Sequence, residues 1–310
     1  MRERPGLALP ALMFLVVACG GSGTAPDPVS EPQTPVETFT LQLGANEFTF
    51  VDSLGNVTRP IRVRYHMPTG YTPSSPIVFV MHGASRGAQS YFNAWLQPAM
   101  DHGFLLVVPE FDDINYPGSR WYNLGNVFPG EEPTTQNPDS TWTFTAIEHL
   151  FDVIRMAAGS SRTTFRIYGH SAGSQFVHRF LMVRPTAPIE RVVAANAGWY
   201  TLPTDSIRWP YGLGDSGFDP SSLAGRYELD VTVLLGDQDT DPNASNLRRT
   251  PEAQDQGPHR FARGHTFHAV ARSSAEALGV PFAWVLDTVP DAGHSNSQMA
   301  PRAAEILARQ

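Results

Sequence analysis

The sequence predicts an α/β protein in which a mostly parallel central sheet is flanked by helices on both faces. Short apolar runs alternate along the chain with longer stretches of helical periodicity, and this alternation is typical of βαβ units. The apolar runs are continuous, as expected of strands that are buried on both faces of a parallel sheet. A length of 310 residues and a hydrophobic content of 41% suit one large domain with a packed core.

The elements follow one another in a regular order. Residues 38–52 and 61–66 alternate well enough for an antiparallel strand pair. Buried strands are expected at 76–81, 104–109, 165–168, 191–195, 231–235 and 281–286, and helices at 90–102, 142–158, 171–183, 261–278 and 297–309. Polar stretches at 112–140 and 200–227 interrupt this order, and loops of such length usually serve as lids or binding loops.

The first 18 residues have the composition of a secretory signal. Basic residues precede an apolar run, which is too short to span a bilayer comfortably as a helix. The sequence Val-Val-Ala-Cys that ends at Cys19 resembles the lipobox of bacterial lipoproteins, in which the cysteine is lipidated and becomes the first residue. Cys19 is the only cysteine, so it has no intramolecular disulfide partner. We expect a lipid anchor on Cys19; a cut by an ordinary signal peptidase after Ala18 is the alternative.

Residues 19–38 are rich in Gly, Ser, Pro and Thr, as a tether between a membrane and a domain should be. A single folded domain is expected over residues 39–310. Gly20 after the cysteine resembles the sorting pattern of outer-membrane lipoproteins, so the expected location is the bacterial cell envelope, at the outer membrane, or outside the cell. The formal net charge is −8 and no basic run of five residues occurs, which argues against nucleic acid as a partner.

The segment from Gly169 to Gly173 reads Gly-His-Ser-Ala-Gly and fits the pattern G-x-S-x-G. A strand-like run precedes it and an amphipathic helix follows it, which is the strand–turn–helix setting of a nucleophile elbow. The tight turn needs glycines because side chains would clash with neighbouring backbone. Ser171 is therefore the predicted nucleophile.

A serine nucleophile needs a base, and the base needs an acid that orients it. In the order serine–acid–histidine, the base should lie late in the chain, and His294 stands between the last expected strand and the last helix. For the acid, Asp237, Asp239 and Asp241 compete after the strand at 231–235. We choose Asp239, because Gly236-x-x-Asp239 has the G-x-x-D spacing common in this arrangement.

The oxyanion hole is expected from backbone N–H groups. One belongs to Ala172, which follows the nucleophile. The second should come from the loop after the strand at 76–81, which begins with a His82-Gly83 step. Ala84 is the predicted donor, with Ser85 as the alternative.

With these motifs in order, the chain from about residue 39 onward resembles the α/β-hydrolase superfamily, and within it the secreted poly(3-hydroxybutyrate) depolymerase-like and feruloyl-esterase-like hydrolases. The resemblance implies an α/β-hydrolase fold and cleavage of small-molecule or polymeric carboxylic esters through an acyl-enzyme, without a metal or other cofactor. A peptidase or amidase on the same fold and an inactive surface-lipoprotein binding module are the alternatives.

Substrate-binding candidates come from position along the chain. Trp199 and Tyr200 follow a core strand, and Trp121 lies on the loop at 112–140, where pocket residues gather in open α/β sheets. The stretch 243–268 holds four arginines, which form either a basic pocket for a substrate carboxylate or ion pairs with nearby acids. Its three histidines lack the pattern of a zinc site.

Overall fold

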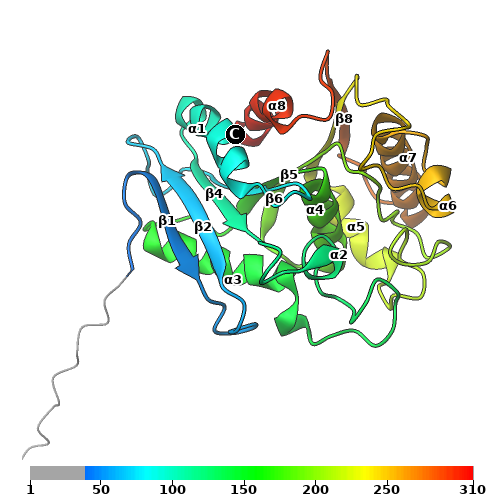
Figure 1. The fold of residues 1–310 in the computed structure, drawn as a ribbon, viewed down its shortest axis with the longest axis horizontal. Helices are drawn as coiled ribbons and strands as arrows, with labels where there is room; N and C mark the ends of the chain where they lie inside the picture. The colour runs from blue at the N-terminus through cyan, green and yellow to red at the C-terminus, as the bar shows by residue number, and fades with distance from the viewer. Residues whose placement is uncertain (1–38, 310) are drawn as a thin grey trace, which may run out of the picture. The chain divides into compact units, whose positions relative to one another are not determined.

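The apolar runs assemble into one sheet of eight strands in the computed structural model, which describes residues 39–309 (Figure 1). Along the sheet the strand order is β1-β2-β4-β3-β5-β6-β7-β8. Strand β2 runs antiparallel to both of its neighbours, and all other pairs are parallel. The strands are β1 (Gly44–Phe50), β2 (Ile61–Met67), β3 (Ile77–Met81), β4 (Leu105–Glu110), β5 (Phe165–His170), β6 (Ile189–Ala195), β7 (Asp230–Gly236) and β8 (Val285–Val289). The predicted fold class and the antiparallel strand pair are confirmed.

Helices cover both faces of this sheet (Figure 1). Two of them, α1 (Ala88–His102) and α8 (Asn296–Ala308), pack together over one face, and α3 (Thr143–Ala157), α4 (Ala172–Val183) and α7 (Arg260–Leu278) cover the other. The loops carry short elements: α2 (Gly118–Trp121), η1 (Asp139–Thr141), η2 (Pro220–Leu223), α5 (Ala224–Tyr227) and α6 (Pro251–Asp255). Within residues 39–309, every helix is too short or too polar to cross a membrane.

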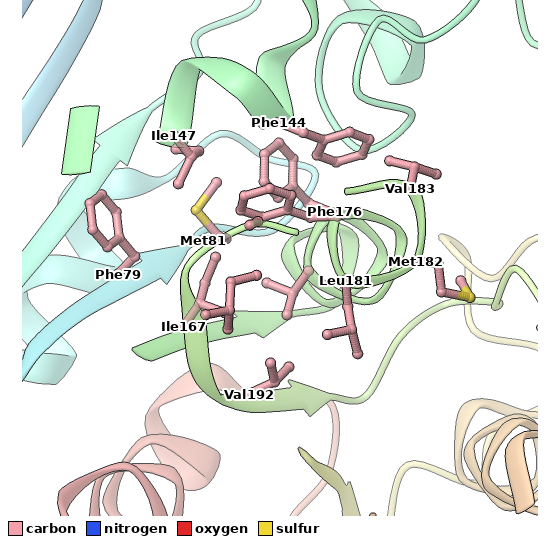
Figure 2. Packing of buried hydrophobic residues seen from close by; sticks show 14 of the residues in the cluster. Phe79, Met81, Phe144, Ile147, Ile167, Phe176, Leu181, Met182, Val183 and Val192 are labelled. Atoms are coloured by element: carbon pink, nitrogen blue, oxygen red, sulfur yellow. The ribbon is translucent and has the colours of Figure 1, made fainter. Parts of the chain in front are cut away.

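Aromatic packing joins α3 and α4 to the central strands. Figure 2 shows Phe144 and Phe176 beside Met81, above the sheet residues Ile167 and Val192. The rings of Phe144 and Phe176 meet edge-on, with centroids 4.7 Å apart. All these side chains are fully buried, so α4 is held rigidly under the turn that precedes it.

The last strand lies later in the chain than the sequence suggests. The expected strand at 281–286 gives way to β8 at Val285–Val289. The apolar residues before it dock elsewhere: Ala283 N–H donates to the Tyr227 carbonyl, and the Trp284 ring lies 5.5 Å from that of Tyr227. Strand β8 forms the sheet edge, so it needs less apolar sequence, and Val285 is 49% exposed.

Residues from Phe39 onward form one compact unit by their internal contacts. The signal segment predicted at 1–18 and the linker predicted at 19–38, with Cys19, lie outside the described residues and stay predictions.

Candidate active site

Ser171 occupies a sharp turn between β5 and α4. Its backbone angles, φ 59° and ψ −117°, lie in a region that residues other than glycine rarely adopt. A Cβ atom on Gly169 would lie 2.1 Å from the Gly173 carbonyl oxygen, and one on Gly173 would lie 2.1 Å from the Met81 carbonyl oxygen. Both glycines are therefore required for the close approach of strand, turn and helix that presents the Ser171 hydroxyl.

Three side chains from three loops form a continuous hydrogen-bonded chain. His294 Nε2 lies 3.0 Å from Ser171 Oγ, and His294 Nδ1 lies 2.7 Å from Asp239 Oδ2. The loops follow β5, β7 and β8, whose carboxyl ends meet at one edge of the parallel sheet. Asp239 is buried, whereas His294 is partly exposed. The arrangement lets the imidazole accept the Ser171 proton while Nδ1–H donates to the carboxylate.

The two competing aspartates lie in other environments. Asp237 accepts a hydrogen bond from the side chain of Gln238. Asp241 is exposed and accepts from the Asn243 N–H at 2.8 Å, as in a turn. Of the three, Asp239 is the one that contacts His294.

Asp239 and the loop of His294 are held from several sides. Arg260 Nη1 lies 3.4 Å from Asp239 Oδ1, and the Asp239 carbonyl accepts from the N–H of Phe261 in the first turn of α7. Asn196 Oδ1 accepts from the Gly236 N–H at 2.9 Å, and Asn196 Nδ2 donates to the Gly293 carbonyl at 3.2 Å. This amide therefore ties the acid loop to the base loop.

His170, the residue before the nucleophile, packs against the base. Its ring centroid lies 4.7 Å from that of His294, and its Nδ1 lies 2.8 Å from the Tyr91 hydroxyl. Burial lowers the pKa of His170 well below its usual value, and the charges of His294 and Arg260 lower it further. A neutral imidazole therefore forms one wall beside His294, a contact that the sequence pattern did not predict.

The predicted oxyanion donors, Ala84 and Ala172, both line the same cleft as Ser171. Ala172 is the first residue of α4, where a backbone N–H has no partner within the helix. Ser85, the alternative to Ala84, is not among the described residues that line the cleft. The choice of Ala84 as the second donor stays a prediction.

A buried histidine fixes the start of this oxyanion loop. His82 Nε2 accepts from the Phe111 N–H at 3.0 Å, which leaves Nδ1–H to donate to the Gly83 carbonyl at 3.0 Å. Burial lowers the pKa of His82 to about 4, so the neutral ring persists at neutral pH. The Tyr122 hydroxyl donates to the His82 carbonyl at 2.6 Å and locks the loop from the other side.

Arg86 joins the oxyanion loop to the segment that follows β4. Its guanidinium donates to the carbonyls of Phe111, Tyr116 and Gly118 at 2.8–3.0 Å. It also lies 4.4 Å from the centre of the Tyr122 ring, within range of a cation–π contact. The long loop predicted at 112–140 thus supports the site as well as lining it.

The cleft above Ser171 has a volume of about 360 Å³. Of the three predicted substrate-binding residues, Trp199 lines it, whereas Tyr200 and Trp121 are absent from its described lining. Tyr200 is fully buried and stacks on Phe267, and Trp121 lies under the guanidinium of Arg59. The remaining lining includes Ser119, Asn123, Gln175, Gly198, Ser245, Asn246, Leu247, Arg248 and Arg260. Several of these belong to the loop 112–140 and the stretch 243–268, whereas Gln175 and Gly198 were not singled out from the sequence.

The arginine-rich stretch 243–268 divides between two roles. Arg260 pairs with Asp239, and Arg248 pairs with Glu131 at 3.0 Å. Arg263 donates to backbone carbonyls, including that of Gly257. Arg248 and Arg260 also line the cleft, so ion pairing and a basic pocket wall coexist. No three His, Cys, Asp or Glu side chains among residues 39–309 are grouped to hold a metal ion.

Comparison with known proteins places the chain in a family. No family model and no curated protein matches it, whereas solved structures do. Poly(aspartic acid) hydrolase-1 from Sphingomonas sp. KT-1 is 43% identical over 87% of this chain and 100% of its own, with a TM-score of 0.82. LpqC, a poly(3-hydroxybutyrate) depolymerase from Bordetella parapertussis, is 37% identical over 86% of this chain and 89% of its own, with a TM-score of 0.80.

The chain belongs to the α/β-hydrolase superfamily. Within it, the chain is similar to the poly(3-hydroxybutyrate) depolymerase-like hydrolases, which confirms the resemblance read from the motifs. FphF, a fluorophosphonate-binding serine hydrolase of Staphylococcus aureus, shares the fold at 13% identity over 86% of this chain and 99% of its own, with a TM-score of 0.52.

Proposed function

We propose that this chain is a serine hydrolase that cleaves carboxylic esters through an acyl-enzyme. Ser171 is the nucleophile, His294 the general base and Asp239 the acid. The observation that carries the proposal is the hydrogen-bonded chain from Ser171 Oγ through His294 to Asp239, at a cleft that the two oxyanion donors also line. The catalytic domain spans residues 39–310.

In the first half-reaction, His294 Nε2 takes the Ser171 proton as Oγ attacks the ester carbonyl carbon. Asp239 stabilises the imidazolium and keeps its tautomer fixed. The carbonyl oxygen becomes an oxyanion that accepts hydrogen bonds from the Ala172 and Ala84 N–H groups, each worth about 3 kcal/mol in comparable sites. Both residues line the cleft beside Ser171, which supports their role as donors.

The first half-reaction ends when the tetrahedral intermediate collapses, His294 gives its proton to the leaving alkoxide, and the alcohol departs to leave the acyl-enzyme. The second half-reaction repeats this proton path with water as the nucleophile. His294 then takes a proton from water, the resulting hydroxide attacks the acyl carbon, and a second oxyanion forms at the same donors. Collapse of this intermediate returns the proton to Ser171 Oγ and releases the carboxylic acid.

Two relatives point to different scissile bonds. LpqC is a depolymerase of poly(3-hydroxybutyrate), a polyester, and supports ester cleavage. The Sphingomonas enzyme hydrolyses poly(aspartic acid), a polyamide with carboxylate side chains. Arg248 in the cleft favours a carboxylate-bearing substrate, so an amide hydrolase acting on anionic polymers is the second candidate. Trp199 would contact the acyl group in either case.

A short p-nitrophenyl ester series tests the proposal, with residues 20–310 and the Ser171→Ala variant side by side. We expect ester hydrolysis by the wild type and almost none by the variant. Equal rates would refute Ser171 as nucleophile and favour an inactive binding module. Matched p-nitroanilides and poly(aspartic acid), run in parallel, separate the esterase from the amidase: faster turnover of these amides would overturn ester specificity.

The N-terminal sequence supports export and a lipid anchor on Cys19, at the outer membrane of a double-membraned bacterium. A Cys19→Ser variant should appear in the soluble envelope or culture fraction rather than pellet with membranes as an acylated protein. Metabolic labelling with a palmitate analogue gives the direct readout, since only Cys19 offers a thiol. Secretion of an unacylated wild type would refute the anchor and support ordinary signal-peptidase cleavage.

A further inference from the structure

A second cavity lies at the β1 edge of the sheet, and its volume of about 620 Å³ exceeds that of the active-site cleft. It is a groove between strand β1 and helix α3. The walls are largely apolar and include Phe39, Phe48, Phe50, Val153 and Met156. No step of the proposed reaction uses this groove.

The rim of the groove concentrates exposed apolar side chains. Ten large hydrophobic residues are exposed in the described chain, and four of them, Phe39, Val51, Leu54 and Met156, line the groove. Leu54 is 72% exposed and Met156 is 66% exposed. Contiguous apolar surface of this kind marks an interaction site, whereas single exposed hydrophobic residues do not.

The charged groups of the groove are paired with one another. His149 Nδ1 lies 2.8 Å from Asp52 Oδ1, and Arg155 Nε lies 2.7 Å from Asp152 Oδ1. Each carboxylate thus has a basic partner inside the groove itself. The surface is therefore suited to an apolar or zwitterionic partner rather than to a strongly charged one.

The chain enters the described domain at this groove, because Phe39 is one of the wall residues and its ring lies 4.8 Å from that of Phe48. The predicted lipid anchor, Cys19, stands only 20 residues before Phe39. Even fully extended, 20 residues reach no farther than about 70 Å. A chain anchored at Cys19 would therefore be tethered through the face that carries this groove, within about 70 Å of the bilayer.

We propose that the groove rim of Phe39, Val51, Leu54 and Met156 is a membrane-docking surface, whose occupant is the surface of a lipid bilayer. The apolar side chains enter the interfacial region of the lipid, in addition to the predicted anchor. Docking there leaves the active site free: in the strand order, β1 stands four positions from β5, which carries Ser171. Four strand spacings amount to about 19 Å.

Vesicle co-sedimentation tests this proposal without the anchor. Residues 39–310 form a compact unit, and residues 20–310, which lack Cys19, serve as the longer form. The probe is phosphatidylcholine vesicles, because they carry no net charge. We expect both forms to bind, and the double variant Leu54→Glu, Met156→Glu to bind at least tenfold more weakly. Met100→Glu, at an exposed position on α1, is the matched control and should bind like the wild type.

Two further measurements distinguish membrane docking from misfolding and from dimer formation. All variants should hydrolyse a soluble p-nitrophenyl ester at the wild-type rate, since none touches the cleft; this separates loss of docking from loss of folding. Absence of vesicle binding by the wild type, or equal binding by the double variant, would overturn the proposal. Light scattering that gives a dimer for the wild type and a monomer for the double variant would also overturn it, because the groove would then belong to a second copy of the chain.

Discussion

Arg260 and His294 contact the two oxygens of the same carboxylate. Arg260 Nη1 lies 3.4 Å from Asp239 Oδ1, and His294 Nδ1 lies 2.7 Å from Asp239 Oδ2. Arg260 is itself buried, and its Nη2 donates to Asn246 Oδ1 at 2.7 Å. The guanidinium therefore orients the acid, and through it the base.

Arg260→Gln is expected to lower kcat by up to about 100-fold, because a small misplacement of a catalytic group has a large effect on rate. Arg260→Lys keeps the charge and should restore part of the loss. Steady-state kinetics on the preferred ester checks this, with the surface variant Arg302→Gln as control. A rise in KM with unchanged kcat would instead assign Arg260 to substrate binding.

Replacing each of the three neighbouring aspartates by asparagine separates the acid from its competitors. Asp239→Asn should lower kcat by about 10⁴-fold, since the amide favours the wrong tautomer of the histidine. Asp237→Asn and Asp241→Asn should stay close to the wild type, because neither side chain contacts His294. A severe loss in the Asp237 variant and a mild one in the Asp239 variant would refute the assignment.

Arg86→Ala should release the segment after β4 from the oxyanion loop. Three hydrogen bonds to backbone carbonyls disappear, and Ala84 is then less well positioned. We expect kcat to fall by about 10-fold to 100-fold with a smaller change in KM, since the donors act mainly in the transition state. Arg120→Ala, which removes a guanidinium stacked on Trp121, provides the control. Unchanged kcat in the Arg86 variant would contradict this supporting role.

Buried histidines should make the fold acid-sensitive. Burial lowers the pKa of His82 to about 4 and those of His170 and His178 well below the usual value. As the pH falls below 6.5, these histidines bind protons in the unfolded chain but stay neutral in the folded chain. Their contribution to the free energy of unfolding is therefore full above pH 6.5 and is lost toward pH 4. His82 alone accounts for on the order of 3 kcal/mol. Urea unfolding at pH 7.0 and 4.5 measures this loss; equal stabilities would contradict it.

The charge of Arg248 should matter for anionic substrates in particular. Arg248→Ala is expected to raise KM for an ester with a carboxylate in its acyl chain by about 10-fold, the effect of losing one charge-assisted contact. KM for a neutral ester of the same length should change little. Equal effects on both esters would argue that Arg248 acts through its packing near Trp199 instead.

The turn at Ser171 could be predicted from the sequence, because it depends on residues that are adjacent in the chain. The choice of Asp239 likewise rests on spacing from Gly236, and the hydrogen bond to His294 agrees with it. Contacts between segments that are distant in the chain were harder to predict. Arg260 reaches Asp239 only because α7 begins beside the acid loop, and Tyr200 turns into the core while its neighbour Trp199 lines the cleft. The spacing of residues along the chain predicts neither the contact of Arg260 nor the directions of the Tyr200 and Trp199 side chains.

The amide of Asn196 has a mechanical consequence. Its oxygen holds the Gly236 N–H and its nitrogen holds the Gly293 carbonyl, so the ends of β6, β7 and the loop after β8 are coupled through one side chain. Strand β8 is an edge strand, and local opening of a sheet is expected most readily at its edges. Asn196 therefore restrains the base loop against the end of β7, and we expect the spacing between Asp239 and His294 to vary less than the position of the β8 edge.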